Sequence, residues 1–153
     1  MIADKHYETL KIDVKTPFVY ITLNRPEVKN AMNQHMVTEL LDAFTTLRDD
    51  RSIRAVVLSG AGNTFCAGGD LKEMQAEIMT RGTVEGRMAV LDELLNAVNR
   101  APQVVIAKVE GAALGGGFGL VCVADMVVAS ATASFGLPEV RLGIVPALIS
   151  PYV

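Results

Sequence analysis

The stretch "EGAALGGGFGL" (Glu110–Leu120) places five glycines among eleven residues, between two apolar runs. The preceding run, "QVVIAKV", has the composition of a buried strand, and the following "FGLVCVAD" is compatible with a helix. A strand that passes through a glycine turn into a helix leaves N–H groups unpaired at the start of that helix. The stretch therefore predicts a backbone site for an anion or an oxyanion. Close packing of helix on strand is the alternative explanation, and phosphate-loop and dinucleotide motifs fail on spacing.

A second glycine turn has the same pattern. In "FCAGGDLKEM" (65–74), Gly68 and Gly69 follow an apolar segment, and Asp70 can begin a helix. An oxyanion hole works poorly with a single N–H donor. Two such turns on neighbouring strands could converge on one carbonyl oxygen, so the two stretches together favour an oxyanion hole.

Elsewhere the chain alternates strand-like and helix-like segments. Helices are expected from Gln34 to about Asp49, over 71–79, and around Met88–Val98, because apolar residues recur there every three to four positions or the composition favours helix. Strands are expected at Leu10–Val14, Phe18–Leu23, Ala55–Ser59, Val104–Val109 and Met126–Ala129. The first two strands should form a hairpin. The alternation predicts an α/β fold with a largely parallel sheet.

Composition excludes several classes of function. The 153 residues suit one domain, and a net charge of −3 gives no footprint for nucleic acid or an anionic membrane. No run of about 18 residues is apolar enough to span a bilayer. Cys66 and Cys122 lack the spacing of a metal or redox motif, so free buried thiols, no metal site and a reducing cytoplasm are expected.

Four segments carry a resemblance to a known family. In order and spacing, "NRPEVKNAMN" (24–33), "FCAGGDLKEM" (65–74), "GAALGGGFGL" (111–120) and "ASFGLPEVRLGIVP" (133–146) resemble the crotonase, or enoyl-CoA hydratase/isomerase, superfamily. The resemblance implies a spiral of ββα repeats that binds an acyl-CoA thioester. It also implies that coenzyme A enters as part of the substrate, with no other cofactor. Homotrimers or dimers of trimers are implied for a full-length chain.

The resemblance also implies roles for individual residues. The amides of Gly69 and Gly116 would hold the thioester oxygen, and Glu139 would transfer protons. Gly119 stands where the usual hydratases have a first glutamate, which departs from the pattern. Further positions match the path of the substrate: Lys29, Ala31, Ala67, Asp70, Leu71 and Lys72. Lys29 and Lys72 can equally be solvated surface lysines, and Met74, Ile78 and Met79 either cover the acyl chain or belong to the core.

The last residues, "ISPYV" (149–153), resemble the bacterial branch that includes methylglutaconyl-CoA and isohexenylglutaconyl-CoA hydratases. Hydration of a branched or carboxylated enoyl-CoA is therefore expected. An enoyl-CoA delta isomerase, other acyl-CoA chemistry and a catalytically silent CoA-thioester-binding fragment remain alternatives. The apolar ending suggests that residues 1–153 are a truncated core domain without the family's C-terminal helices. Its apolar side chains should then lie exposed, disordered or against another subunit: Ile144, Val145, Leu148, Ile149 and Val153.

Overall fold

A five-stranded sheet forms the centre of the computed structural model, which describes residues 1–83, 85–143, 145–147 and 149–153. Strands β1 (Leu10–Lys15) and β2 (Phe18–Leu23) form the expected antiparallel hairpin. Three parallel strands follow: β3 (Ala55–Gly60), β4 (Val104–Val109) and β6 (Met126–Ala129). All five predicted strands are thus present, and most of the sheet is parallel.

The strands lie in the order β1-β2-β3-β4-β6, which follows the chain without reversal. A doubly wound nucleotide-binding sheet reverses its order at a switch point, so that architecture is excluded for this sheet. Two short strands, β5 (Ala112–Leu114) and β7 (Ser134–Gly136), pair in parallel as a second sheet. The sequence reading placed no strand at either segment, because three residues are too few to show a period of two.

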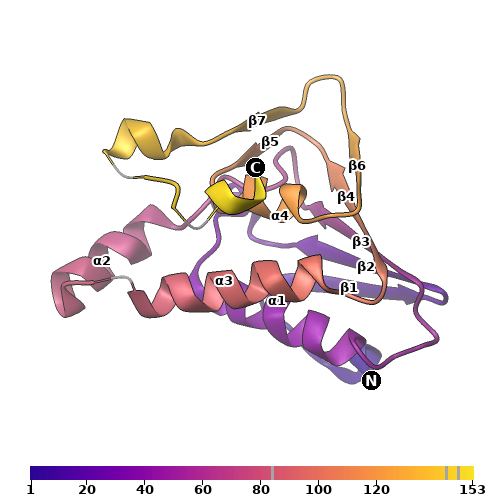
Figure 1. Ribbon diagram of the computed structural model, residues 1–153. Coiled ribbons are helices and arrows are strands. Elements are labelled where there is room, and N and C mark those ends of the chain that lie inside the picture. The colour runs from indigo at the N-terminus through magenta and orange to yellow at the C-terminus, as the bar shows by residue number, and fades with distance from the viewer. Residues whose placement is uncertain (84, 144, 148) are drawn as a thin grey trace.

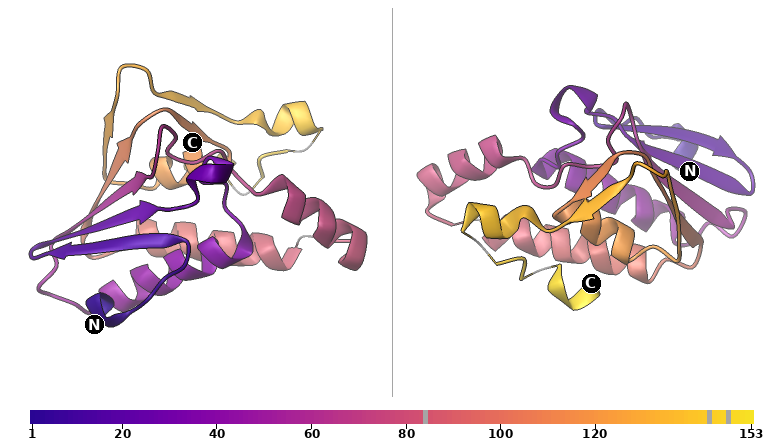
Figure 2. Two further views of the ribbon diagram at one scale, coloured as in Figure 1. Left: turned by 180° about the vertical axis from the view of Figure 1, so that it is seen from behind. Right: turned by 90° about the horizontal axis from the view of Figure 1, so that it is seen from above.

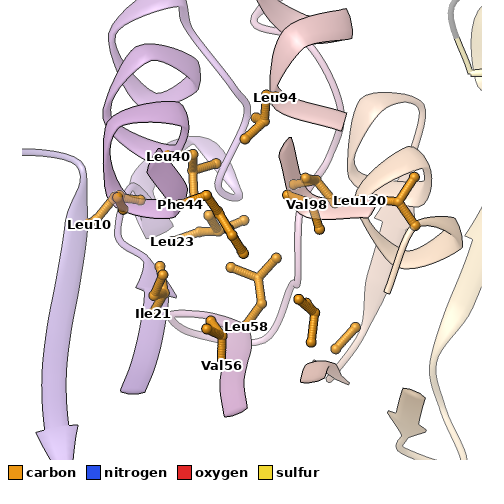
Figure 3. Close-up of a cluster of buried hydrophobic side chains, with 14 of the residues drawn as sticks. Leu10, Ile21, Leu23, Leu40, Phe44, Val56, Leu58, Leu94, Val98 and Leu120 are labelled. Atoms are coloured by element: carbon orange, nitrogen blue, oxygen red, sulfur yellow. The ribbon is translucent and has the colours of Figure 1, made fainter. Parts of the chain in front are cut away.

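Two long helices pack side by side against the first sheet (Figure 1). Helix α1 (Gln34–Leu47) begins where the Asn33 side chain accepts a 2.9 Å hydrogen bond from the Met36 amide, a typical N-cap. Helix α3 (Glu85–Asn99) is the second of the pair. Figure 3 shows their apolar side chains meeting those of β2 and β3 in one core, among them Leu40, Phe44, Leu94, Ile21 and Leu58.

The remaining helices are not part of the α1–α3 pair. Helix α2 (Leu71–Arg81) projects from the body in both views of Figure 2, and the short α4 (Gly116–Cys122) follows β5 directly. The described residues also form four 3₁₀ turns: η1 (Ile2–Asp4), η2 (Pro26–Val28), η3 (Pro138–Leu142) and η4 (Ser150–Tyr152). No helix among the described residues is both long and apolar enough to cross a membrane.

The apolar end of the chain only partly follows the expectation. Val145 and Val153 are 78% and 65% exposed, as expected. Ile149, however, is 4% exposed, so the prediction for this residue was wrong. Its side chain packs beside Gly119, which has no side chain of its own. Ile144 and Leu148 lie outside the described residues.

Candidate active site

One cavity gathers nearly all of the predicted site residues. It has a volume of about 560 Å³ and lies among the first turns of α2 and α4, helix α3 and η3. The predicted residues that line it are Ala31, Ala67, Gly69, Asp70, Leu71, Lys72, Gly116 and Glu139. Lys29 is exposed and does not line the cavity, but its carbonyl accepts a 3.0 Å hydrogen bond from the amide of Ala67. Met74 lines the cavity too, whereas Ile78 and Met79 are exposed to solvent.

A parallel bridge between Cys66 and Ala113 holds the two glycine turns side by side. Its hydrogen bonds run from the Cys66 amide to Ala112, at 3.0 Å, and from Leu114 back to the Cys66 carbonyl, at 2.9 Å. Gly69 and Gly116 each follow their own bridge residue by three positions. The parallel register therefore brings equivalent points of the two turns together.

The backbones of the turns are in contact. A Cβ atom on Gly115 would lie 3.6 Å from the Cα of Gly68. Gly68 has φ +102° and Gly115 has φ +51°, a region that side chains rarely allow. A Cβ on Gly116 would approach the methyl group of Met32 to 2.5 Å. The conformation therefore requires glycine at 68 and 115, and the close contact between the two turns depends on the absence of side chains there.

The direction of the Gly69 amide is fixed by its neighbours. The Gly68 carbonyl accepts a 2.7 Å hydrogen bond from the Met32 amide, and the Asp70 amide donates to the Met32 carbonyl at 2.9 Å. Because a trans peptide is planar, the N–H of Gly69 points opposite to the Gly68 carbonyl, away from Met32. Within the described part of the chain, nothing accepts a hydrogen bond from this amide.

The Gly116 amide is oriented by the same geometry. The Gly115 carbonyl accepts the first hydrogen bond of α4, from the Gly119 amide at 3.0 Å. The N–H of Gly116 shares a peptide plane with that carbonyl and therefore points the other way, out of the helix start. First-turn amides have no acceptor within their own helix. Gly116 lines the same cavity as Gly69.

Glu139 brings a carboxylate to these turns. It lies in η3 directly after Pro138, and its Oε1 is 3.0 Å from the position that a Cβ on Gly115 would take. Its Oε2 is buried and has no hydrogen-bond partner among the described residues. Buried polar atoms in proteins are nearly always paired, so an unpaired carboxylate oxygen is typical of a group that meets a ligand.

The Asp70 side chain is engaged within the protein. Its Oδ1 accepts a 3.3 Å hydrogen bond from the Glu73 amide and caps α2, while Oδ2 accepts one from Arg25 at 3.1 Å. Burial alone would raise the pKa of Asp70, but the Arg25 guanidinium and the α2 amides together lower it. Asp70 therefore lines the cavity, but both of its carboxylate oxygens already accept hydrogen bonds from within the protein.

Sequence reasoning missed Arg87, which also lines the cavity. Arg87 is 8% exposed and pairs with Glu73 and Glu77 of α2; its Nε lies 3.1 Å from a Glu77 carboxylate oxygen. Its burial could have been predicted from the sequence, because it lies four and seven residues before Leu91 and Leu94 on the apolar face of α3. A charged residue on that face indicates a buried ion pair.

Comparison with known proteins identifies the family. Residues 14–153 match the family described as Enoyl-CoA hydratase/isomerase. The chain belongs to that family. A probable enoyl-CoA hydratase of Rhizobium meliloti (strain 1021) is 40% identical over 142 residues, which are 93% of this chain and 54% of that protein. The probable enoyl-CoA hydratase echA8 of Mycobacterium bovis is 38% identical with the same coverage.

Solved structures share the fold of this chain. Pseudomonas aeruginosa AtuE has a TM-score of 0.91 and 48% identity, covering 95% of this chain and 57% of that one. An enoyl-CoA hydratase/isomerase from Marinobacter aquaeolei has a TM-score of 0.88 and 44% identity, covering 94% of this chain and 57% of that one. The predicted crotonase-type α/β fold is therefore confirmed. This member of the enoyl-CoA hydratase/isomerase family spans about half the length of the curated relatives it matches.

Proposed function

We propose that this chain carries the active site of an enoyl-CoA hydratase-type enzyme, which adds water to a 2,3-unsaturated acyl-CoA thioester. The observation that carries the proposal is the convergence at one cavity of two glycine turns and the unpaired Oε2 of Glu139. In this proposal the amides of Gly69 and Gly116 donate hydrogen bonds to the thioester oxygen. Glu139 is the acid–base residue.

The proposed reaction uses one carboxylate twice. Glu139 takes a proton from water while the water oxygen forms a bond to the β-carbon. The electrons of the double bond then move toward the thioester, and the negative charge develops on its oxygen. Two preorganised N–H donors stabilise that charge. In other enzymes, removing one such donor raises the activation free energy by about 2.7–4 kcal/mol. Glu139 finally returns the proton to the α-carbon.

The apolar part of the cavity lining suits the hydrocarbon portion of the acyl group of a CoA thioester. Met32, Met74 and Leu91 supply apolar walls, while Lys72 supplies a cation at the rim. We place the coenzyme A moiety along Ala31, Ala67, Leu71 and Lys72, with Lys29 able to approach its phosphates. The similarity of "ISPYV" to one hydratase branch favours a branched or carboxylated acyl group. In this proposal residues 1–153 are the core domain, assembly is trimeric and the location is cytoplasmic.

Isomerisation of the double bond is the second candidate. It needs the same oxyanion hole and one proton-transfer group, but no water. Gly119 supplies no carboxylate, and the apolar side chain of Ile149 lies against it. This arrangement favours chemistry with a single carboxylate, as an isomerase requires.

The direct test is to assay the full-length gene product with a panel of 2-enoyl-CoA and 3-enoyl-CoA thioesters, following both hydration and double-bond movement. Hydration of a 2-enoyl-CoA is expected. Double-bond movement without water uptake would favour the isomerase. Tight CoA-thioester binding without turnover of any panel member would contradict both and indicate a catalytically silent CoA-thioester-binding protein.

A further inference from the structure

The two features that set this sequence apart from the usual hydratase pattern meet in the structure. They are Gly119 and the "ISPYV" segment, which begins at Ile149. A Cβ atom on Gly119 would lie 3.3 Å from Cγ2 and 3.4 Å from Cγ1 of Ile149. It would also lie 3.6 Å from a methyl group of Leu95 on α3. Contacts of 3.3–3.4 Å are tight for a Cβ, so Ile149 would have to move by a few tenths of an ångström to admit even a methyl group at position 119.

Ile149 also separates Gly119 from the cavity. It is 4% exposed and lines the cavity, whereas Gly119 is buried and is not among the lining residues. The segment around Ile149 is held by short-range backbone bonds, from the Ile149 amide to Pro146 at 3.1 Å and from Tyr152 to the Ile149 carbonyl at 2.9 Å. The side chain thus forms the wall of the cavity at the point where Gly119 lies behind it.

We infer that Ile149 is a specificity-determining residue: it occupies the space that a side chain at position 119 would need and makes that wall of the active site apolar. The inference rests on the proposed function for its catalytic consequence. A buried water requires two to four polar partners, and Ile149 offers none with its side chain. The part of the acyl group that faces this wall is therefore hydrocarbon, and Glu139 is left to transfer protons without a second carboxylate.

A simple packing role for Ile149 makes a different prediction. If Ile149 only fills the core, its truncation destabilises the fold regardless of what stands at position 119. If instead Ile149 occupies the space that a side chain at position 119 would need, the effects of substituting the two residues on binding or stability are coupled. Residues in contact show such coupling in double-mutant cycles, whereas independent residues show additive effects.

The test is a double-mutant cycle in the full-length chain with Gly119→Glu, Ile149→Ala and the double variant. The probe is butyryl-CoA, an unreactive thioester whose dissociation constant is measured by calorimetry. Gly119→Glu alone should weaken binding by about tenfold or more, and adding Ile149→Ala should restore it to within about threefold, as expected for contacting residues. With a second carboxylate in place, the double variant should hydrate crotonyl-CoA at least about tenfold faster than Gly119→Glu alone.

Leu91→Ala in the Gly119→Glu background is the matched control. Leu91 also lines the cavity and loses the same number of carbon atoms, but it lies beside Gly116, and the atoms nearest to a Cβ on Gly119 belong to Ile149 and Leu95 instead. Leu91→Ala should not restore binding. Rescue by Leu91→Ala equal to that by Ile149→Ala, or wild-type binding by Gly119→Glu, would overturn the inference.

A melting-temperature cycle keeps the inference separate from the proposed function. If Gly119→Glu does not fold, Gly119→Ala replaces it, and melting temperatures replace binding as the readout of the cycle. Non-additive melting temperatures then support the inference, and additive ones overturn it. If the wild-type chain turns over no enoyl-CoA thioester, the proposed function fails, while the melting-temperature cycle still decides whether Ile149 holds the space at position 119.

Discussion

At the scale of the residue, Glu139 is the side chain on which the proposed chemistry depends. Glu139→Gln keeps the size of the side chain but removes its basicity. We expect kcat to fall by at least about 10²-fold, because general acid–base catalysis contributes roughly 10²–10⁴. Binding of butyryl-CoA should change little, since the donors of the thioester site are backbone amides. Steady-state kinetics on the preferred substrate, with calorimetry for binding, measure the two effects.

The matched control for this variant is Glu110→Gln. Glu110 is exposed and pairs with Lys108 at 2.7 Å, away from the cavity lining. Its kcat should stay at the wild-type value. Near-normal turnover by Glu139→Gln would mean that another group moves the proton, and both the hydratase and the isomerase proposals would lose their catalytic residue.

Cys66 lies directly beneath the Gly68–Gly69 turn. Its Sγ accepts a 3.4 Å hydrogen bond from the Gly68 amide, and burial raises the pKa of its thiol to about 12. The thiolate is the reactive form, so Cys66 should be inert toward iodoacetamide at neutral pH in the folded protein. Mass spectrometry should find Cys66 alkylated only after denaturation. Cys122, which is partly exposed, is the internal comparison; faster labelling of native Cys66 than of Cys122 would contradict the packing described here.

At the scale of the element, α2 is held over the cavity mainly by polar contacts. No residue of 71–80 is buried, although Leu71, Lys72 and Met74 line the cavity. Arg87 on α3 pairs with Glu73 and Glu77 of α2, and Glu73 also accepts a 2.9 Å hydrogen bond from the Gln34 amide at the start of α1. Burial would lower the pKa of Arg87, but the two carboxylates outweigh it and raise the pKa, so Arg87 stays charged.

Arg87→Met should therefore loosen α2 more than it changes the chemistry. We expect KM for an enoyl-CoA to rise about tenfold, in line with the roughly 1.5–3 kcal/mol carried by hydrogen bonds to charged groups. The expected change in kcat is small, because the glycine turns and Glu139 are untouched. Hydrogen exchange across 71–80 should accelerate. Arg100→Met, at an exposed position after α3, is the control, and unchanged exchange in α2 of Arg87→Met would show that other contacts hold the helix.

At the scale of the whole molecule, carboxylates join the N-terminal segment to α1. Glu39 is 8% exposed and accepts hydrogen bonds from the amides of Glu8, at 2.7 Å, and Thr9, at 2.9 Å, and from the Thr9 hydroxyl. Burial alone would raise the pKa of Glu39, but these hydrogen bonds and the charge of His35 outweigh it and lower the pKa. The folded state thus favours the ionised carboxylate.

A lowered folded-state pKa gives stability that is complete above the ordinary carboxyl pKa of 4.5 and is lost as the pH falls through the folded-state value. Asp42 acts in the same direction, because Lys5 and Tyr7 lower its pKa despite partial burial. Urea unfolding from about pH 7 down to pH 3 should show this decline. In Glu39→Gln the decline should be shallower, and the free energy of unfolding at neutral pH should be lower by about 1–3 kcal/mol. Identical pH profiles for the two proteins would contradict this role for Glu39.

Much of the architecture could be predicted from local sequence. Apolar spacing placed α1 and α3, and the Asn33 cap placed the start of α1 at its observed residue. Alternation and apolar runs placed all five strands of the large sheet. The glycines of 68–69 and 115–117 indicated two turns with unpaired donors. These features depend on neighbours within a few positions along the chain, so the sequence by itself determined them.

Only the tertiary structure decided which of these features meet. The Cys66–Ala113 bridge joins the two glycine turns, although they lie far apart along the chain, and Gly69 and Gly116 line one cavity. Arg87 has its partners on another helix, and Ile149 covers Gly119 from a segment that was expected to lie exposed. The periodicity of α3 places Arg87 on its apolar face but does not name its partners, and the contact of Ile149 with Gly119 leaves no periodic signal, because each contact depends on how separate elements pack. Ile149 packs into the space beside Gly119, which lies thirty residues earlier in the chain. No local sequence pattern marks a contact between segments that far apart.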